Sequence, residues 1–287
     1  MEAVTGKLGP AAATLGRLRR RIEPGETLAG SGGPSGNVTI AYRRIPGKSP
    51  GVVFLTGYRS SMEGAKALAL EAYCRASGRA YVRFDYQGHG ETGGDFESCT
   101  LSTWIGDALA IVDGATEGPQ ILVGSSMGGW IMVRVALARA DRVAGLAGIA
   151  TAADFTETLM WDAFDTEWRM KILSGTPWRG PSAEGDSETV VTRALIEDGR
   201  RHLVLKNRIA IAQPVRLLHG TADNAVPWQL SQRLLEQLDC DDATLTLVKD
   251  GGHRMSRPHE IGHVVRAVDD LVRQAESSAS TAARPSR

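Results

Sequence analysis

The segment 124–128, which reads Gly-Ser-Ser-Met-Gly, has the composition of a turn that presents a nucleophilic serine. It follows an apolar run at 120–123 and precedes a helical pattern that begins at Met127. A serine on so sharp a turn between a strand and a helix needs small neighbours, and Gly124 and Gly128 supply the room. The hydroxyl then lies at a helix N-terminus, where partial positive charge favours a developing anion. We therefore predict that Ser126 is a nucleophile.

A serine hydroxyl is a poor nucleophile without a base, and the base needs a carboxylate that orients it. Asp223 comes shortly after an apolar run at 215–218, and His253 comes shortly after another at 244–248. The order serine, acid, histidine is the one found when such a turn sits on an α/β sheet. We predict that His253 is the base and Asp223 the orienting acid. Asp154, which follows the run 143–149, is the alternative acid.

Acyl transfer also needs two backbone N–H groups that point at the developing oxyanion. One is expected from Met127, the residue after the nucleophile. The other is expected from the loop after the run 51–55, which reads Thr-Gly-Tyr-Arg at 56–59, and we choose Tyr58. Three further histidines compete less well as bases: His219 is expected to be packed at a strand end, His89 lies in a glycine-rich loop, and His202 lies in an irregular segment.

Two motifs point to other classes of protein. Residues 88–93 match the dinucleotide fingerprint G-x-G-x-x-G, but the loop continues where a helix should open, and the next strand does not end on an acid. Residues 259–263 spell H-E-x-x-H, which can bind zinc on a helix. Here a proline precedes the motif, a glycine lies inside it, and no third ligand suggests itself. We expect no nucleotide cofactor and no metal.

The elements that must position these residues alternate regularly along residues 37–274. Apolar runs at 51–55, 80–85, 120–124, 143–149, 215–218 and 244–248 are predicted strands. Helical patterns cover 66–77, 102–115, 127–140, 228–237 and 259–274. This alternation predicts an α/β fold with a mostly parallel central sheet and helices on both faces. Ligands bind such sheets beyond the carboxyl ends of the strands, where the predicted catalytic residues fall.

Residues 154–205 interrupt the alternation, because they contain no clear strand and have a loop-rich centre at 174–186. We interpret them as a helical lid inserted over the strand ends. Trp161, Phe164 and Trp168 are spaced at i, i+3 and i+7, which would place them on one face of a helix. They are the candidate residues of a substrate pocket; packing of these rings against the sheet is the alternative.

The formal net charge is zero and the isoelectric point is about 7.0, which argues against a nucleic-acid or anionic-membrane binder. No apolar run approaches the 18 residues or so of a membrane-spanning helix. Three widely spaced cysteines, Cys74, Cys99 and Cys240, cannot form a disulfide framework and favour a reducing compartment.

The two ends of the chain are predicted to lie outside the α/β domain of residues 37–274. Residues 1–36 form an extension that is basic near its start and faintly similar to a mitochondrial transit peptide. The reducing compartment that the cysteines favour is expected to be the cytoplasm, and this likeness makes the mitochondrial matrix the alternative. Residues 275–287 are small and polar, which predicts a disordered tail.

With these motifs in place, the chain resembles the α/β-hydrolase superfamily over about residues 37–274. Residues 83–86, 118–130 and 216–220 look like the group that contains the mitochondrial α/β-hydrolase domain-containing protein 10, and residues 226–228 and 250–255 fit the same group. Its members are described as palmitoyl-protein thioesterases and acyl-glucuronide esterases. The resemblance places the nucleophile, acid and base on Ser126, Asp223 and His253. It implies a small-molecule ester or acyl-thioester substrate, or an acylated protein.

The leading hypothesis is therefore a serine hydrolase that cleaves carboxylic ester or thioester bonds through an acyl-enzyme. A cofactor-free perhydrolase or a carbon–carbon bond hydrolase could use the same triad. A third alternative is a catalytically silent hydrolase scaffold that acts as a binding module. The intact triad and its glycines argue against the last of these, because loss of catalysis usually leaves one of those positions altered.

Overall fold

Ten strands and seven α-helices make up the described part of the computed structural model, which comprises residues 26–29, 38–182 and 188–282. The strands are β1 (Glu26–Ala29), β2 (Thr39–Ile45), β3 (Lys48–Leu55), β4 (Arg79–Phe84), β5 (Gln120–Ser125), β6 (Val143–Ile149), β7 (Trp178–Pro181), β8 (Glu188–Val191), β9 (Val215–Gly220) and β10 (Ala243–Val248). The helices are α1 (Ala65–Ser77), α2 (Leu101–Ala115), α3 (Met127–Ala138), α4 (Thr166–Leu173), α5 (Arg193–Gly199), α6 (Gln229–Gln237) and α7 (Pro258–Ala282).

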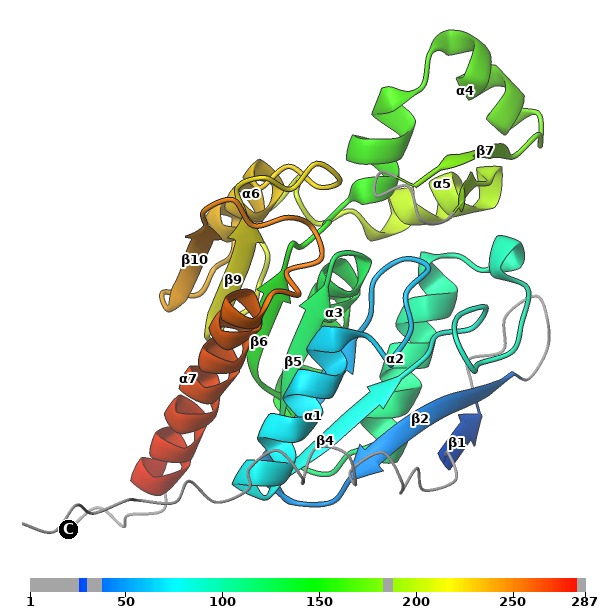
Figure 1. Cartoon of the computed structure of the whole chain (residues 1–287). Coiled ribbons are helices and arrows are strands. Elements are labelled where there is room, and N and C mark those ends of the chain that lie inside the picture. The colour runs from blue at the N-terminus through cyan, green and yellow to red at the C-terminus, as the bar shows by residue number, and fades with distance from the viewer. Residues whose placement is uncertain (1–25, 30–37, 183–187, 283–287) are drawn as a thin grey trace, which may run out of the picture.

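Eight strands form one sheet in the order β1-β2-β4-β3-β5-β6-β9-β10 (Figure 1). Strands β4, β3, β5, β6, β9 and β10 run parallel to one another, whereas β1 and β2 are antiparallel to their neighbours. Leu55 of β3 is in register with Gly124 of β5, and Ser125 of β5 is in register with Ile149 of β6. The predicted α/β fold with a mostly parallel sheet is confirmed, and the strand ends that should carry the site lie together at one edge.

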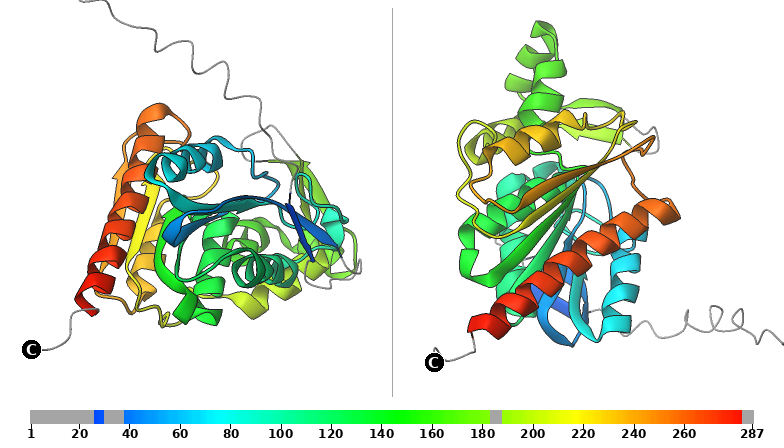
Figure 2. Two further views of the ribbon diagram at one scale, coloured as in Figure 1. Left: turned by 90° about the horizontal axis from the view of Figure 1, so that it is seen from below. Right: turned by 90° about the vertical axis from the view of Figure 1, so that its left-hand side faces the viewer.

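Side chains of the central strands alternate between two helical layers. In β5, Leu122 packs in the apolar cluster that includes side chains of α2, α3 and α6. Ile121 and Val123 pack on the opposite face with side chains of α1 and α7. The two layers can be followed in Figure 2, where the red α7 and the cyan α1 lie across the sheet from the green helices. Both faces of the sheet are therefore covered, as parallel strands require.

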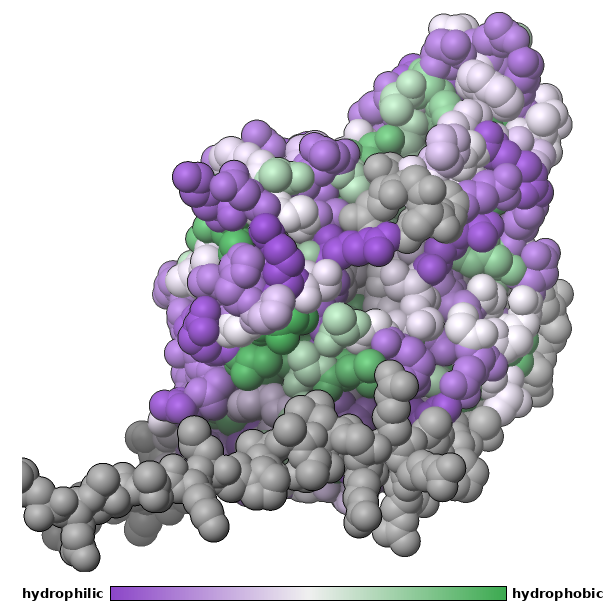
Figure 3. Space-filling model, viewed as in Figure 1, coloured by the Kyte–Doolittle hydropathy of each residue, from purple (hydrophilic) through white to green (hydrophobic). Residues whose placement is uncertain are grey.

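The chain between β6 and β9 forms a lid above the carboxyl ends of the strands (Figure 1). It contains a π-helical segment (Thr156–Met160), a short 3₁₀ turn (Trp161–Ala163), α4, the hairpin β7–β8 and α5. In Figure 3 the lid projects from the body, with a hydrophobic area on an otherwise polar surface. The insertion is as predicted, but the expectation that it lacks strands is wrong. β7 and β8 pair antiparallel from Trp178–Val191 to Pro181–Glu188.

The three lid aromatics do not share one helix, contrary to the prediction. Trp161 begins the 3₁₀ turn, and Phe164 has extended backbone at the end of that turn. Asp165 then starts α4 as its N-cap, because its carboxylate accepts a hydrogen bond from the Trp168 amide at 2.8 Å. The i, i+3, i+7 spacing therefore spans two separate elements.

Both predicted terminal segments also differ in part from the structure. α7 continues to Ala282, so residues 275–282 of the predicted disordered tail are helical. Glu276 forms an ion pair at 2.6 Å with Arg79, whose side chain is 4% exposed, and this contact ties the added turns to the body. Residues 26–29 of the predicted extension form β1. The rest of the two predictions, residues 1–25, 30–36 and 283–287, falls outside the described residues. Within the described ranges, no helix combines the length and apolar character needed to cross a bilayer.

Candidate active site

Ser126 lies at the turn between β5 and α3 with a φ of 54° and a ψ of −119°. A positive φ is strained for a residue with a side chain. Its N–H donates to the carbonyl of Ile149 at 2.9 Å, and its own carbonyl accepts from the Gly129 amide at 2.9 Å. Glycines make the turn possible, since a Cβ added at Gly124 would lie 2.4 Å from the carbonyl oxygen of Gly128. The strand, the helix and the glycines together hold the serine at the sheet edge.

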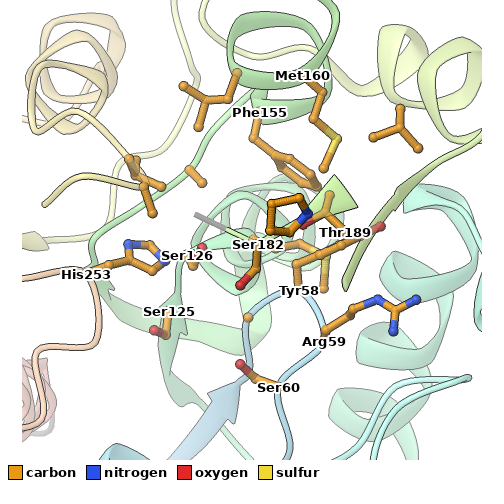
Figure 4. A pocket seen from close by; sticks show the side chains of 18 of the residues that line it. Tyr58, Arg59, Ser60, Ser125, Ser126, Phe155, Met160, Ser182, Thr189 and His253 are labelled. Atoms are coloured by element: carbon orange, nitrogen blue, oxygen red, sulfur yellow. Dashed lines mark hydrogen bonds between the residues drawn. The ribbon is translucent and has the colours of Figure 1, made fainter. Parts of the chain in front are cut away.

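The structure brings Ser126, His253 and Asp223 together from loops that follow β5, β10 and β9. Nε2 of His253 lies 3.1 Å from Oγ of Ser126, and Nδ1 lies 2.8 Å from Oδ2 of Asp223. A carboxylate can only accept, so Nδ1 is the donor and Nε2 is left to accept the serine proton. Figure 4 shows the imidazole directed at Ser126. This is the geometry of an activated serine.

The carboxylate of Asp223 is buried and receives four hydrogen bonds. Oδ2 also accepts from Nε2 of His219 at 3.1 Å, while Oδ1 accepts from the amides of Ala225 at 2.9 Å and Val226 at 2.8 Å. Burial alone would raise the pKa of this carboxyl group. The hydrogen bonds from His219 and His253 outweigh burial, and the pKa lies well below its usual range. The group is therefore ionised throughout the neutral range.

Asp154, the alternative acid, has a different role in the structure. Its carboxylate accepts from the amides of Val204 at 2.8 Å and Leu205 at 3.0 Å, at the point where the lid returns to the body. Its backbone has a φ of 58°, and its side chain is buried. Burial raises the pKa of this carboxyl group. The position of Asp154 is that of a structural link across the base of the lid.

The loop after β3 lies against the serine turn, as expected for an oxyanion hole. A Cβ added at Gly57 would be 3.3 Å from the Cβ of Ser126. Met127 opens α3, so its amide is one of the helix N–H groups without an intrahelical partner. In the described part of the chain, the Tyr58 amide donates to no other group. Both predicted donors are thus next to Ser126 and available.

A cavity of about 860 Å³ opens beside Ser126 and His253. Its apolar wall comes mainly from the lid, where Phe155 and Met160 face Ser126 and His253 (Figure 4). Phe164 and Trp168 also line the cavity. A groove with a hydroxyl group at one end and an apolar wall beside it suits an acyl group.

Trp161 lies elsewhere and is not among the described residues that line the cavity. Its ring packs under the guanidinium of Arg200 at 4.6 Å and near that of Arg169 at 5.4 Å. The ring also contacts the small lid core of Ile172, Val191 and Ile196. Of the three predicted pocket aromatics, the structure therefore places two at the cavity and one within the lid.

Two histidines that the sequence did not assign to the site form hydrogen bonds with its residues or with their neighbours. His219 is fully buried; its Nε2 donates to Asp223 and to the Val226 carbonyl at 2.9 Å, and its Nδ1 accepts from Ser231 at 2.7 Å. His89 accepts the Arg59 amide, next to the expected oxyanion donor. The only sequence signal for either residue is its position near a strand end. His219 lies at the end of β9, four residues before Asp223, and His89 lies in the loop after β4.

The two motifs from other classes have structural explanations. The loop 88–93 is followed by a 3₁₀ turn, Phe96–Ser98, rather than by a helix that opens from it. In the H-E-x-x-H segment, the Glu260 carboxylate is buried and accepts from the backbone and side chain of Arg257 at the start of α7. Among the described residues, no group of three His, Cys, Asp or Glu side chains is placed to hold a metal ion.

The sheet order, the serine turn and the lid between β6 and β9 are those of an α/β hydrolase. The model of the alpha/beta hydrolase family matches residues 52–264, and the chain belongs to that family.

Within the family, the chain is similar to "Palmitoyl-protein thioesterase ABHD10, mitochondrial" of Bos taurus. The two are 41% identical over 234 residues, which is 81% of this chain and 76% of the relative. The structure of alpha/beta hydrolase domain-containing protein 10 from mouse superposes with a TM-score of 0.80 at 38% identity, covering 88% of this chain and 99% of that one. The crystal structure of a protein from Agrobacterium vitis S4 that is described as a hydrolase gives 0.81 at 38% identity, covering 87% and 100%.

Proposed function

We propose that this protein is a serine hydrolase that cleaves carboxylic esters or thioesters through an acyl-enzyme, with medium- to long-chain acyl thioesters as its substrates. The observation that carries the proposal is the unbroken chain of contacts from Asp223 through His253 to Ser126, at 2.8 and 3.1 Å. These distances fall within the reach that proton transfer requires.

In the proposed first step, Ser126 Oγ attacks the acyl carbon while His253 Nε2 takes its proton. The amides of Tyr58 and Met127 hold the negative oxygen of the tetrahedral intermediate. His253 then returns the proton to the leaving oxygen or sulfur, and the acyl group stays on Ser126. Water, deprotonated by His253, attacks the acyl-enzyme, and the acid leaves as Ser126 regains its proton.

The substrate class rests on the cavity and on the relatives. Phe155, Met160, Phe164 and Trp168 give the cavity an apolar wall that an acyl chain would fill. Each methylene that is buried there contributes about 0.8 kcal/mol. The relatives named palmitoyl-protein thioesterase support a thioester, either of a small molecule or of an acylated protein. A thiolate also leaves with little help from an acid.

The proposed compartment is the cytoplasm, with the mitochondrial matrix as the alternative suggested by the names of the relatives. Cys74 and Cys99 are buried free thiols. Burial raises the pKa of Cys74 to about 12 and that of Cys99 to about 11, so both stay protonated. Fractionation of cells that express the tagged protein would distinguish the two compartments.

The decisive experiment combines an active-site probe with a substrate panel. Wild type should be labelled by a fluorophosphonate and should hydrolyse acyl thioesters. Ser126→Ala should lose both activities while keeping its thermal unfolding midpoint. Ser125→Ala is the matched control, because Ser125 is the neighbouring serine in the same turn and should keep both. Labelling that persists in Ser126→Ala, or that disappears in Ser125→Ala instead, contradicts the assignment.

The alternative functions correspond to specific outcomes of the same experiment. A labelled protein that turns over peroxide with short acids, or cleaves carbon–carbon bonds, but not thioesters would be a perhydrolase or a carbon–carbon bond hydrolase. A folded protein that neither labels nor turns over any substrate would be a silent scaffold that binds a partner.

A further inference from the structure

The loop that carries the proposed oxyanion donor Tyr58 is fixed on one side by the body of the protein. Arg59 has a φ of 54°, a left-handed conformation that is costly for a residue with a side chain. Its amide donates to Nε2 of His89 at 3.1 Å, and Nδ1 of His89 donates to the Gln87 carbonyl at 3.1 Å. Ser60 closes the turn through a bond from its amide to the Gly57 carbonyl at 3.1 Å.

The same loop is fixed on its other side by the lid. The hydroxyl of Tyr58 donates to the backbone carbonyl of Val190 in β8 at 2.6 Å, across 132 positions of the sequence. Burial raises the pKa of this hydroxyl, which therefore remains a donor at neutral pH. The Tyr58 ring meets Phe155 of the lid edge-on, with ring centroids 5.8 Å apart. One side chain thus joins the lid hairpin to the backbone beside Ser126.

The lid residues around this contact line the cavity. Thr189 and Val191, the residues on either side of Val190, lie at its wall, and so does Phe155 (Figure 4). An acyl chain in the cavity would press on these side chains and hold the hairpin down. Without an acyl chain, the hairpin still has its own small core, the ion pair of Arg179 with Glu97 at 2.6 Å and the Tyr58 hydrogen bond; the chain would add a further contact to these.

We propose that Tyr58 is a positioning residue whose hydroxyl couples the seating of the lid hairpin to the orientation of the Tyr58 amide in the oxyanion hole. This inference rests on the proposed function and adds how the acyl chain is selected. Contacts far from the reacting carbon would raise kcat as well as lower KM, because they help to organise a donor that acts only in the transition state. His89 supplies the fixed side of the loop, and Val190 supplies the side that responds to the substrate.

The test is Tyr58→Phe, which keeps the amide and the ring and removes only the hydroxyl. In wild type, kcat should rise from acetyl to palmitoyl thioesters. In Tyr58→Phe, the kcat for long chains should fall about tenfold, less than the 10²–10³ that loss of an entire donor costs. The kcat for acetyl thioesters should fall by a smaller factor, so the profile of kcat becomes flatter. KM should still decrease with chain length, because the cavity wall is unchanged.

Tyr73→Phe is the matched control, because the Tyr73 hydroxyl bonds to Asp269 of α7 at 3.0 Å, outside the residues that line the cavity. It should leave both profiles as they are. A Tyr58→Phe variant whose kcat is unchanged, or falls equally for every chain length, overturns the coupling.

Alkyl fluorophosphonates of increasing chain length separate this inference from the proposed function. The maximal rate of inactivation depends on the oxyanion hole but not on turnover of a thioester. It should rise with alkyl length in wild type and not in Tyr58→Phe. If both proteins label with the same rising profile, the coupling fails while the serine assignment stands. If wild type does not label at all, the proposed function fails together with the inference drawn from it.

Discussion

Nε2 of His219 lies 3.1 Å from Oδ2 of Asp223, the same oxygen to which His253 donates. The second histidine is fully buried, and Ser231 sets its tautomer by donating to Nδ1. The orientation of the Asp223 carboxylate is therefore fixed by groups other than His253. The remaining freedom in this part of the site lies in the His253 ring, which is 18% exposed.

The two aspartates that compete as the acid should respond differently to the same substitution. Asp223→Asn should lower kcat by about 10⁴, because the amide cannot hold the imidazole in the productive tautomer. Asp154→Asn should instead weaken the bonds to Val204 and Leu205 and reduce the free energy of unfolding by about 1–3 kcal/mol. Steady-state kinetics and urea unfolding of both variants check this. If Asp154→Asn loses activity but keeps its stability, the orienting acid is Asp154, after the earlier strand.

His89 should make the protein less stable in mild acid. Burial lowers the pKa of His89 to about 4 from an ordinary 6.5. Between these values the unfolded chain binds a proton at this position that the folded protein does not, so stability falls as the pH falls from 6.5 to 4. The loss is about 1.4 kcal/mol per pH unit at most. His89→Gln cannot titrate and should show a flatter dependence. Urea unfolding of both proteins at pH 7 and pH 5 measures the difference; parallel curves would contradict a neutral, buried His89.

The preference for acyl chain length should depend on Trp168 and not on its exposed neighbour. Trp168 lines the cavity, whereas Met170 on the same helix is 67% exposed. In wild type, kcat/KM should climb severalfold for every two carbons, since each buried methylene contributes about 0.8 kcal/mol. Trp168→Ala should reduce that slope, and Met170→Ala should preserve it. Measurement of kcat/KM from acetyl to palmitoyl thioesters decides the matter, and a flat profile in wild type would indicate a small, polar substrate.

Activity should not depend on a metal ion. The Glu260 carboxylate is occupied by Arg257, so the H-E-x-x-H segment lacks a free general base. Dialysis against EDTA should leave kcat/KM unchanged, and His263→Ala should be nearly silent. Glu260→Ala should lower the unfolding midpoint, because the start of α7 loses its buried acceptor for the Arg257 amide. Activity that is lost to EDTA and restored by zinc would be incompatible with the mechanism proposed here.

Much of the site could be predicted because each of its parts follows a strand with a plain apolar signal. The glycine-flanked turn predicts Ser126, and the order of the chain with the positions after strands predicts Asp223 and His253; the parallel sheet then brings them together. The supporting histidines could not be found in this way. Whether His219 donates to Asp223 or packs elsewhere depends on a rotamer that no sequence pattern specifies.

The lid was predicted less well, for reasons that lie in its short elements. β7 and β8 have four residues each, and Gly180 and Pro181 in β7 read as breakers of a strand. The spacing of Trp161 and Trp168 predicts one helix, whereas in the structure Asp165 lies between them and caps the start of a new helix. At the other end of the chain, small and polar residues suggested disorder, whereas the pairing of Glu276 with Arg79 holds them in α7.

The contact of Asp154 with Val204 and Leu205 closes the lid into a loop whose two ends meet at one carboxylate. These ends lead to β6 and β9, which are neighbours in the sheet. An insertion that leaves and returns at adjacent strands places no constraint on the register of the sheet beneath it. The outer part of the lid can therefore change without disturbing the sheet. Chimeras that keep Asp154, the amides of Val204 and Leu205, the contact of Asp198 with Ser102 and a carbonyl for the Tyr58 hydroxyl should accept lids of other lengths, and with them other substrates.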